Sequence, residues 1–183
     1  PIDYFKDQES KPVENRYVGE LYFQAHRGTY TSQARTKRGN RKSEMALREA
    51  ELWGVAARAL AGYTFPAETI DEAWKKVLLN QFHDIIPGSS IERVYEEAEA
   101  DYARVLETAR QITQQAQGAL ADEGEALTVF NALSWERRAL VELPEALGAV
   151  VDAFGDPLPT QIVRGTTWAE VDLARGVIRL PGS

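Results

Sequence analysis

Residues 91–120 read IERVYEEAEADYARVLETARQITQQAQGAL and carry the most regular apolar pattern of the chain. Apolar or small residues recur there at alternating spacings of four and three, namely Ile91, Tyr95, Ala98, Tyr102, Val105, Ala109, Ile112, Ala116 and Ala119. A sustained repeat of this kind forms a single apolar seam along a helix. It predicts a long helix that packs against neighbouring helices in the same chain, with a dimeric coiled coil as the alternative.

Two further helices are expected upstream of this one. The first spans residues 43–61, with Gly62 as its C-terminal stop and an apolar stripe formed by Met45, Leu52, Ala56, Ala59 and Leu60. The second opens on a capping box at Thr69–Glu72 and ends near Ile86, because Pro87 disfavours helical geometry at the preceding residue. A second capping box starts the long helix at Ser89 or Ser90. Three helices joined by short turns predict an antiparallel bundle.

After Gly124 the pattern changes to short strands separated by Asn, Pro and Gly turns. The expected strands are 127–130, 140–143, 161–164, 168–171 and 177–180. We expect a mainly α three-helix bundle followed by the first antiparallel strands of a β-sandwich, as a fragment of a larger protein. The absence of an initiator Met at Pro1 supports the fragment interpretation.

Composition excludes several classes of function. The 183 residues contain no cysteine, which excludes disulfides, thiolate zinc fingers and a cysteine nucleophile. The formal net charge of -7 does not match the basic surface of a nucleic-acid binder. No apolar run is long enough to span a membrane. We therefore expect a cytoplasmic protein with no nucleic-acid or membrane partner.

The N-terminal part is more basic and less regular. Residues 19–23 are expected to form a short strand, and residues 26–32 a polar loop that contains His26. The basic run at residues 35–42 is interpreted as a solvated helix entry, with phosphate or nucleic-acid binding as the alternative.

The chemistry is expected around His83, one of only two histidines. At about 100° per residue, His83 lies opposite a stripe on the second helix that contains Trp74, Val77, Leu78, Gln81, Phe82 and Ile85. The side chain should therefore point to solvent in the last helical turn. It is either a functional group or a surface histidine favoured by the helix C-terminal dipole.

Three motifs resemble glycoside hydrolase family 38, the zinc-dependent α-mannosidases. Residues 78–91, LLNQFHDIIPGSSI, are similar to the signature of that family. Residues 19–33, GELYFQAHRGTYTSQ, followed by Lys37 and Asn40-Arg41, resemble the segment that leaves its catalytic domain. Residues 129–137, VFNALSWER, resemble the start of its C-terminal β-domain. Phe82 and Pro87-Gly88-Ser89 favour the bacterial and cytosolic branch.

The resemblance implies a role for three residues. His83 corresponds to the zinc-ligating histidine that the helical domain supplies, and Asp84 to an aspartate beside the bound mannose. His26 is a weaker candidate for lining the same pocket. The implied cofactor is one zinc ion, with the remaining ligands and the nucleophile in a missing N-terminal catalytic domain. No catalytic residue of the implied retaining α-mannoside hydrolysis is expected within this fragment, which should be inactive alone.

The resemblance also implies a domain organisation, in which this chain is a fragment of a larger α/β + α + β protein. Residues 1–40 would be the exit segment of the catalytic domain, 41–123 the three-helix bundle of the middle domain, and 124–183 the start of the β-sandwich. The expected partners are an α-mannoside substrate and the missing catalytic and β-domains, with a homo-oligomer of the parent protein also open. The alternative function is an autonomous helical-bundle interaction module with no catalysis.

Overall fold

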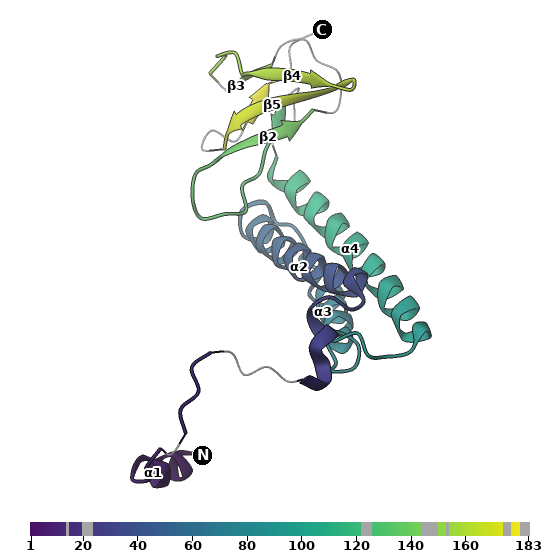
Figure 1. The fold of residues 1–183 in the computed structure, drawn as a ribbon. Helices are drawn as coiled ribbons and strands as arrows, with labels where there is room; N and C mark the ends of the chain where they lie inside the picture. The colour runs from purple at the N-terminus through teal and green to yellow at the C-terminus, as the bar shows by residue number, and fades with distance from the viewer. Residues whose placement is uncertain are drawn as a thin grey trace.

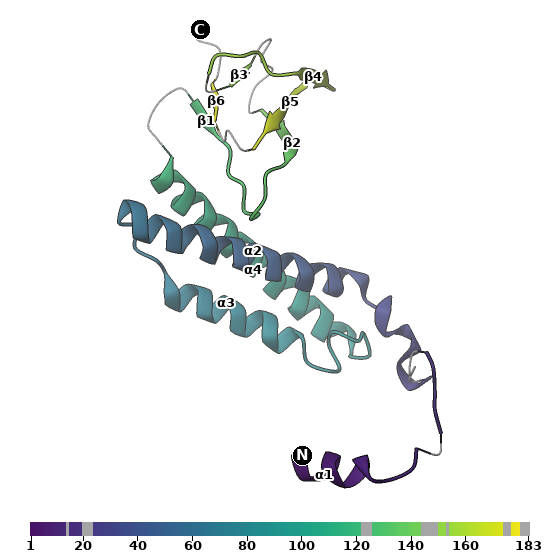
Figure 2. The same cartoon turned by 90° about the vertical axis from the view of Figure 1, so that its left-hand side faces the viewer.

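The computed structural model describes residues 1–13, 15–19, 24–121, 126–143, 150–152, 154–173 and 177–179. Three long helices lie side by side, and two small sheets lie beyond the C-terminal end of the last helix (Figure 1, Figure 2). A helical bundle followed by antiparallel strands is thus confirmed. The short helix α1 (Ile2–Glu9) has no buried residue. None of the helices in the described ranges is long and apolar enough to cross a membrane.

The bundle consists of α2 (Ala34–Ala61), α3 (Ala67–Asn80) and α4 (Glu92–Leu120). Helices α2 and α4 are parallel, because Arg35 pairs with Glu99 at one end of the bundle and Tyr63 donates to Gln115 at the other. Helix α3 runs in the opposite direction between the two connections. Successive helices are therefore antiparallel, as expected.

The seam of α4 forms the centre of this bundle. Seven of its nine predicted positions are buried, namely Tyr95, Ala98, Tyr102, Val105, Ala109, Ile112 and Ala116. Ile91 precedes the helix and is exposed, and Ala119 is also exposed. The buried part of the seam packs against Leu47 of α2 and Val77 of α3 within one chain. Because these contacts already occupy the seam, they favour the intramolecular bundle over the coiled-coil dimer.

Helix α2 differs from its prediction in length and in its buried face. It begins at Ala34, nine residues before the expected Ser43, and ends at Ala61, where Gly62 with a φ of 69° confirms the predicted stop. The buried side chains are Thr36, Ser43, Leu47, Ala50, Gly54 and Ala57. Met45, Leu52 and Leu60 of the predicted stripe are exposed. The face with small residues is the buried one, because small side chains let α2 approach α4 closely. The more apolar face of α2 is therefore exposed to solvent.

The ends of α3 and α4 also differ from the prediction. Helix α3 starts at Ala67 after Pro66, so Thr69 lies inside the helix and does not cap it. Helix α4 starts after Ile91, again with no side-chain cap. Of the predicted α3 stripe, Val77 is buried whereas Leu78 and Phe82 are exposed. The predicted loop at residues 26–32 is largely the 3-10 helix η1 (Gln24–Tyr30), and the predicted strand at residues 19–23 falls almost wholly outside the described residues.

Tyr102 is the most unusual member of the α4 seam. It is 2% exposed, and its ring packs so closely on Gly39 that a Cβ there would lie 2.6 Å from Cδ2. Its hydroxyl has no hydrogen-bond partner among the described residues. Burial, with smaller contributions from the negative charges of Glu44 and Asp101, raises the pKa of Tyr102 to about 12.

We expect this shift to make the protein sensitive to alkali. The unfolded chain releases the tyrosine proton near pH 10, whereas the folded protein retains it until about pH 12. Stability from this group is therefore complete below pH 10 and is lost as the pH rises towards 12. Tyr102→Phe lacks the titrating group, so it should lose less stability at high pH than the parent. The free energy of unfolding of the variant minus that of the parent should be about 1 kcal/mol larger at pH 11 than at pH 7. Urea unfolding at both pH values measures this.

The exposed Tyr4→Phe variant is the matched control, because Tyr4 belongs to α1, which has no buried residue. It should follow the parent at both pH values. Parallel loss of stability in the parent and in Tyr102→Phe would contradict the assignment.

The C-terminal strands form two antiparallel three-stranded sheets. The first has the order β1-β6-β3 and the second β2-β5-β4. Their bounds are β1 (Ala126–Thr128), β2 (Arg138–Glu142), β3 (Val151–Asp152), β4 (Thr160–Val163), β5 (Thr166–Asp172) and β6 (Val177–Arg179). All five predicted strands are present with shifted ends, whereas β3 was not predicted because it has only two residues.

Alternation along β5 explains how the two sheets enclose a core. Thr167, Ala169 and Val171 are buried, and the residues between them are not. Ala169 and Val171 pack with Val150, beside β3 of the other sheet, and with Leu143 and Leu173. This small core is separate from that of the bundle. The ring contact between Trp53 of α2 and Phe130 after β1, with centroids 5.0 Å apart, joins the two parts.

Candidate functional site

The candidate site lies in residues 81–91, which connect α3 to α4 and which we call the 81–91 connection. The prediction extended the second helix to Ile86, but α3 ends at Asn80. The chain continues as tight turns, in which the amide of Ile85 donates to the carbonyl of Phe82 at 2.9 Å and the amide of Gly88 to that of Ile85 at 3.1 Å. Pro87 and Gly88, with a φ of 94°, are incompatible with a continued helix.

His83 and Asp84 project from this connection into solvent. Their side chains are 78% and 62% exposed, so the predicted exposure of His83 is confirmed. The imidazole Nε2 lies 3.9 Å from the Asp84 carboxylate Oδ2. The ring of Phe82 packs beside the imidazole, with centroids 4.3 Å apart. His83 therefore presents an accessible imidazole, although it lies in a turn after the helix and not in the last helical turn.

Side chains from α2 and α4 form hydrogen bonds with the backbone of the 81–91 connection. Lys37 of α2 donates to the carbonyl of Ile86 at 2.8 Å. Tyr95 of α4 donates to the carbonyl of Asp84 at 3.4 Å and accepts from the amide of Ser90 at 2.6 Å. The backbone that follows His83 is thus bonded to both neighbouring helices.

A polar cluster fixes the start of the connection. The Gln81 amide nitrogen donates to Asn40 Oδ1 and to Glu44 Oε1, each at 2.9 Å, and the Asn40 amide donates to the same Glu44 oxygen at 3.1 Å. Both acceptors belong to α2. The connection is therefore attached to α2 at its beginning through Gln81 and at its middle through Lys37.

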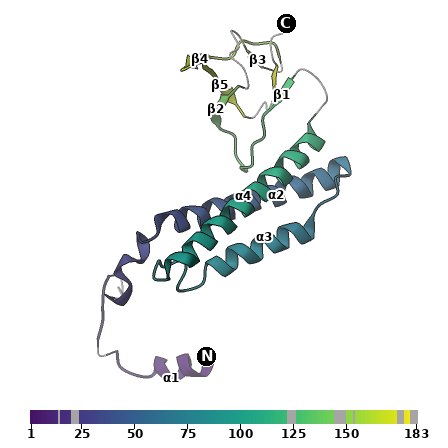
Figure 3. The same ribbon diagram turned by 90° about the vertical axis from the view of Figure 1, so that its right-hand side faces the viewer.

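The segment before α2 also packs against the connection. A Cβ at Gly88 would lie 2.6 Å from the Cβ of Ser32 and 3.0 Å from its carbonyl oxygen. Ser32 itself closes a turn with Gly28, to whose carbonyl its amide donates at 2.7 Å. The first motif, residues 19–33 with Lys37 and Asn40-Arg41, therefore meets the 78–91 motif through its described residues at one end of the bundle (Figure 3).

The other predicted site residue is placed only in part. The backbone of His26 belongs to η1, but its side chain lies outside what the structure describes. Over the described residues, no three His, Cys, Asp or Glu side chains gather as a metal site. The structure thus brings His83 and Asp84 together.

The basic run before the bundle core contains a residue whose role the sequence did not reveal. Arg35, Arg38, Arg41 and Lys42 are exposed, as a solvated helix entry requires. Lys37 is instead half-buried, and burial lowers its pKa. The sequence marked Lys37 only as a member of the motif that resembles the segment leaving the family 38 catalytic domain, and that motif gave the residue no role.

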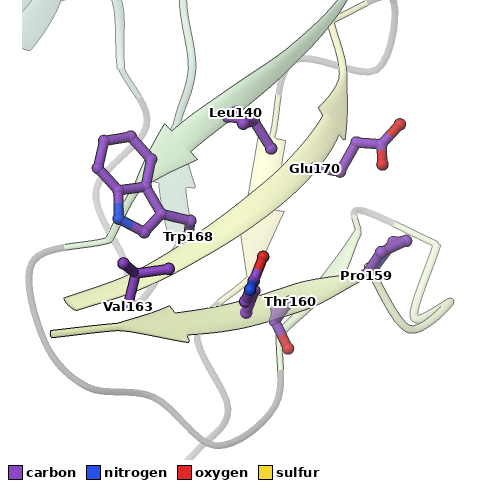
Figure 4. A pocket seen from close by; sticks show the side chains of 7 residues that line it. Leu140, Pro159, Thr160, Val163, Trp168 and Glu170 are labelled. Carbon is purple, nitrogen blue, oxygen red and sulfur yellow. The ribbon is translucent and has the colours of Figure 1, made fainter. Parts of the chain in front are cut away.

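A concave surface lies on the outer face of the β2-β5-β4 sheet. It has a volume of about 520 Å³, and Trp168, Val163 and Leu140 supply its apolar lining. Thr160 and Glu170 add polar groups at its edge (Figure 4). The 29 residues of α4, about 43 Å at 1.5 Å per residue, separate this sheet from the 81–91 connection. It is not part of the His83 site.

Residues 24–120 match the family described as the alpha mannosidase middle domain. This range contains the whole bundle and the 81–91 connection. Alpha-mannosidase 2C1 of Homo sapiens is 39% identical over 137 residues, which cover 73% of this chain and 13% of the human protein. An alpha-mannosidase of Saccharomyces cerevisiae is 51% identical over 82 residues, covering 43% of this chain and 8% of the yeast protein.

The fold also matches solved structures. A glycosyl hydrolase family 38 protein from Enterococcus faecalis aligns with a TM-score of 0.64 over 98% of this chain and 26% of its own, at 19% identity. An alpha-mannosidase from Enterococcus faecalis V583 aligns with a TM-score of 0.62, also at 19% identity. At that identity the likeness concerns the fold alone. The chain spans less than a fifth of the length of the curated relatives it matches.

Proposed function

Because this chain belongs to the glycoside hydrolase family 38 α-mannosidases and represents their central region, we propose that the protein in which it works hydrolyses terminal α-mannosides. The observation that carries the proposal is the 81–91 connection, which exposes His83 and Asp84 from a backbone bonded to both neighbouring helices. Exposed side chains on a fixed backbone suit a site completed by another domain.

His83 is proposed as a zinc ligand. An imidazole nitrogen is a common protein ligand of zinc, and that of His83 is accessible. The remaining ligands would come from an N-terminal catalytic domain, since the described residues do not gather three ligating side chains. Bound zinc would hold sugar hydroxyls and favour distortion of the ring.

Asp84 is proposed to accept hydrogen bonds from hydroxyl groups of the bound mannose. Its carboxylate is exposed beside His83, so one sugar could contact both side chains. His26 remains a weaker proposal for the same pocket. The reaction would be retaining, in which one carboxylate attacks the anomeric carbon and a second carboxyl group protonates the leaving oxygen. Both groups would be supplied by the catalytic domain.

The domain assignment also stays a proposal. Residues 1–40 would lead out of the catalytic domain, 41–123 would form the middle-domain bundle, and 124–183 would begin the β-sandwich. Helix α2 crosses the first of these limits, because it starts at Ala34. We further propose a cytoplasmic location for the parent protein, and that it can form a homo-oligomer.

The experiment compares the 183-residue chain with a longer family 38 protein that contains it. Both are assayed for hydrolysis of an α-mannoside, before and after zinc is removed with a chelator. We expect no activity from the 183 residues, and an activity of the longer protein that is lost on chelation and restored by zinc. Activity of the 183 residues alone, or chelator-resistant activity of the longer protein, would contradict the proposal.

A further inference from the structure

Two side chains that do not belong to the proposed zinc and sugar site contact the backbone beside it. We propose that Lys37 and Tyr95 are positioning residues, which hold the 81–91 connection so that His83 and Asp84 are presented in one fixed orientation. The proposal concerns these two residues of α2 and α4, and its functional part rests on the proposed role of His83.

Lys37 joins two segments that are distant in sequence. Its ammonium donates to the carbonyl of Ile86 at 2.8 Å and to that of Ser32 at 2.5 Å. Ser32 lies just before α2, whereas Ile86 lies 49 residues after Lys37. A single charged group thus links the residue that precedes α2 with the end of the turn that contains His83. Hydrogen bonds from a charged donor are roughly twice as strong as those between neutral groups.

Partial burial makes this contact consequential. Lys37 is half-buried, and the loss of solvent lowers its pKa. Partial burial of a charged ammonium costs free energy of desolvation, and hydrogen bonds to the two carbonyl acceptors offset that cost. Without the ammonium, both carbonyls would lose a donor in a place that water reaches less easily.

Tyr95 contacts the connection from the opposite helix. It is 5% exposed, so its ring is fixed within the seam of α4. Its hydroxyl bonds to the carbonyl of Asp84 and to the amide of Ser90. The two positioning residues therefore bond to carbonyls at residues 84 and 86, from different helices.

His83 itself has little that could fix it. Its imidazole is 78% exposed, and the contacts that it makes with described residues are the ring of Phe82 and, at 3.9 Å, the carboxylate of Asp84. Its place in space consequently depends on the backbone of the connection. Removal of a group that orients a metal ligand without binding the metal itself typically changes metal affinity or activity by about 10–100-fold.

The first test measures amide hydrogen exchange in the 183-residue chain, with no metal or sugar present. In Lys37→Met, the amides of Ile86 and Gly88 should exchange about tenfold faster, because a charge-assisted bond to the connection is lost. Amides in the bundle core, such as that of Ala109, should be unchanged. Lys42→Met, on the exposed face of the same helix, is the matched control. Unchanged exchange at Ile86 and Gly88 would overturn the proposal.

Tyr95→Phe provides a second, independent variant. It removes only the hydroxyl, and we expect the amides of Ser90 and Gly88 to exchange several-fold faster while the core amides do not change. If Lys37→Met proves too unstable to measure, Tyr95→Phe decides the outcome. Exchange at the connection that equals the parent's would then overturn the proposal.

The functional part is tested by zinc titration of the longer mannosidase. Lys37→Met should raise the zinc dissociation constant by about 10-fold or more, and Lys37→Arg should restore part of it because the positive donor is kept. Equal zinc affinities in the parent and Lys37→Met would overturn the positioning role. Failure of the proposed function would look different: His83→Ala would then leave zinc affinity intact, while the exchange results at the connection would stand.

Discussion

Replacing His83 with alanine in a family 38 mannosidase that carries this chain should reduce both zinc content and α-mannoside hydrolysis by more than about 100-fold. The imidazole is the exposed donor of the 81–91 connection, and alanine offers no substitute ligand. Metal content after gel filtration and kcat/KM at saturating zinc measure the two effects. Partial recovery of activity at high zinc would be consistent with a weakened site.

Arg93→Ala is the matched control for this variant. Arg93 lies in the first turn of α4 and its side chain is 80% exposed, close to the value for His83. It should keep full zinc content and rate. In the 183-residue chain, His83→Ala should change the free energy of unfolding by less than about 0.5 kcal/mol, because an exposed side chain contributes little to stability. Normal zinc content and rate in His83→Ala would refute the ligand assignment.

Leu47→Ala should destabilise the bundle far more than any substitution at its surface. Leu47 is 0% exposed and packs in the core cluster with Val77 and Val105. Truncation removes buried apolar surface and leaves a cavity, at a cost of about 2–5 kcal/mol. Urea unfolding followed by far-ultraviolet circular dichroism, which reports mainly the helices, measures the change.

Leu78→Ala is the control for size and residue type. Leu78 lies on α3, next to Val77, but is 59% exposed. Its replacement should cost less than about 1 kcal/mol. A similar cost for both variants would mean that the two leucines are equally buried in solution, which would contradict the packing of Leu47 in the bundle core.

The parts of the fold that could be predicted from the sequence are those with a single dominant pattern. The seam of α4 repeats without interruption, so only one face of that helix can be buried. The end of α2 at Gly62 was also predictable, because the left-handed conformation there favours glycine. The antiparallel strands followed from their short lengths and from the turn residues between them.

Helix α2 could not be predicted in the same way because it carries two possible faces. Met45 and Leu52 form the more apolar one, but Ala50, Gly54 and Ala57 form the one that is buried. Close approach to α4 selects small residues, and the close contact of Gly39 with Tyr102 is an example. Which face of α2 is buried depends on the neighbouring helix, and the local periodicity of α2 contains no information about that helix.

The candidate site likewise has a part that local sequence could predict and a part that depends on contacts between elements. The exposure of His83 followed from its position opposite the Trp74 stripe, although the helix ends earlier than that argument assumed. The contacts of Lys37 and Tyr95 with the connection could not be predicted, because they join different elements through backbone carbonyls, which leave no mark in the sequence.

The strand order β1-β6-β3 has a consequence for the order of folding during synthesis. The bundle is complete once residue 120 has left the ribosome, because all of its helices lie within residues 34–120. Strand β1, by contrast, pairs with β6, so Leu127 must wait for Ile178 before it has a partner. Long-range pairing of this kind is slow compared with helix packing. We therefore expect the nascent chain to acquire a folded helical bundle, with the 81–91 connection in place, before the first sheet can close.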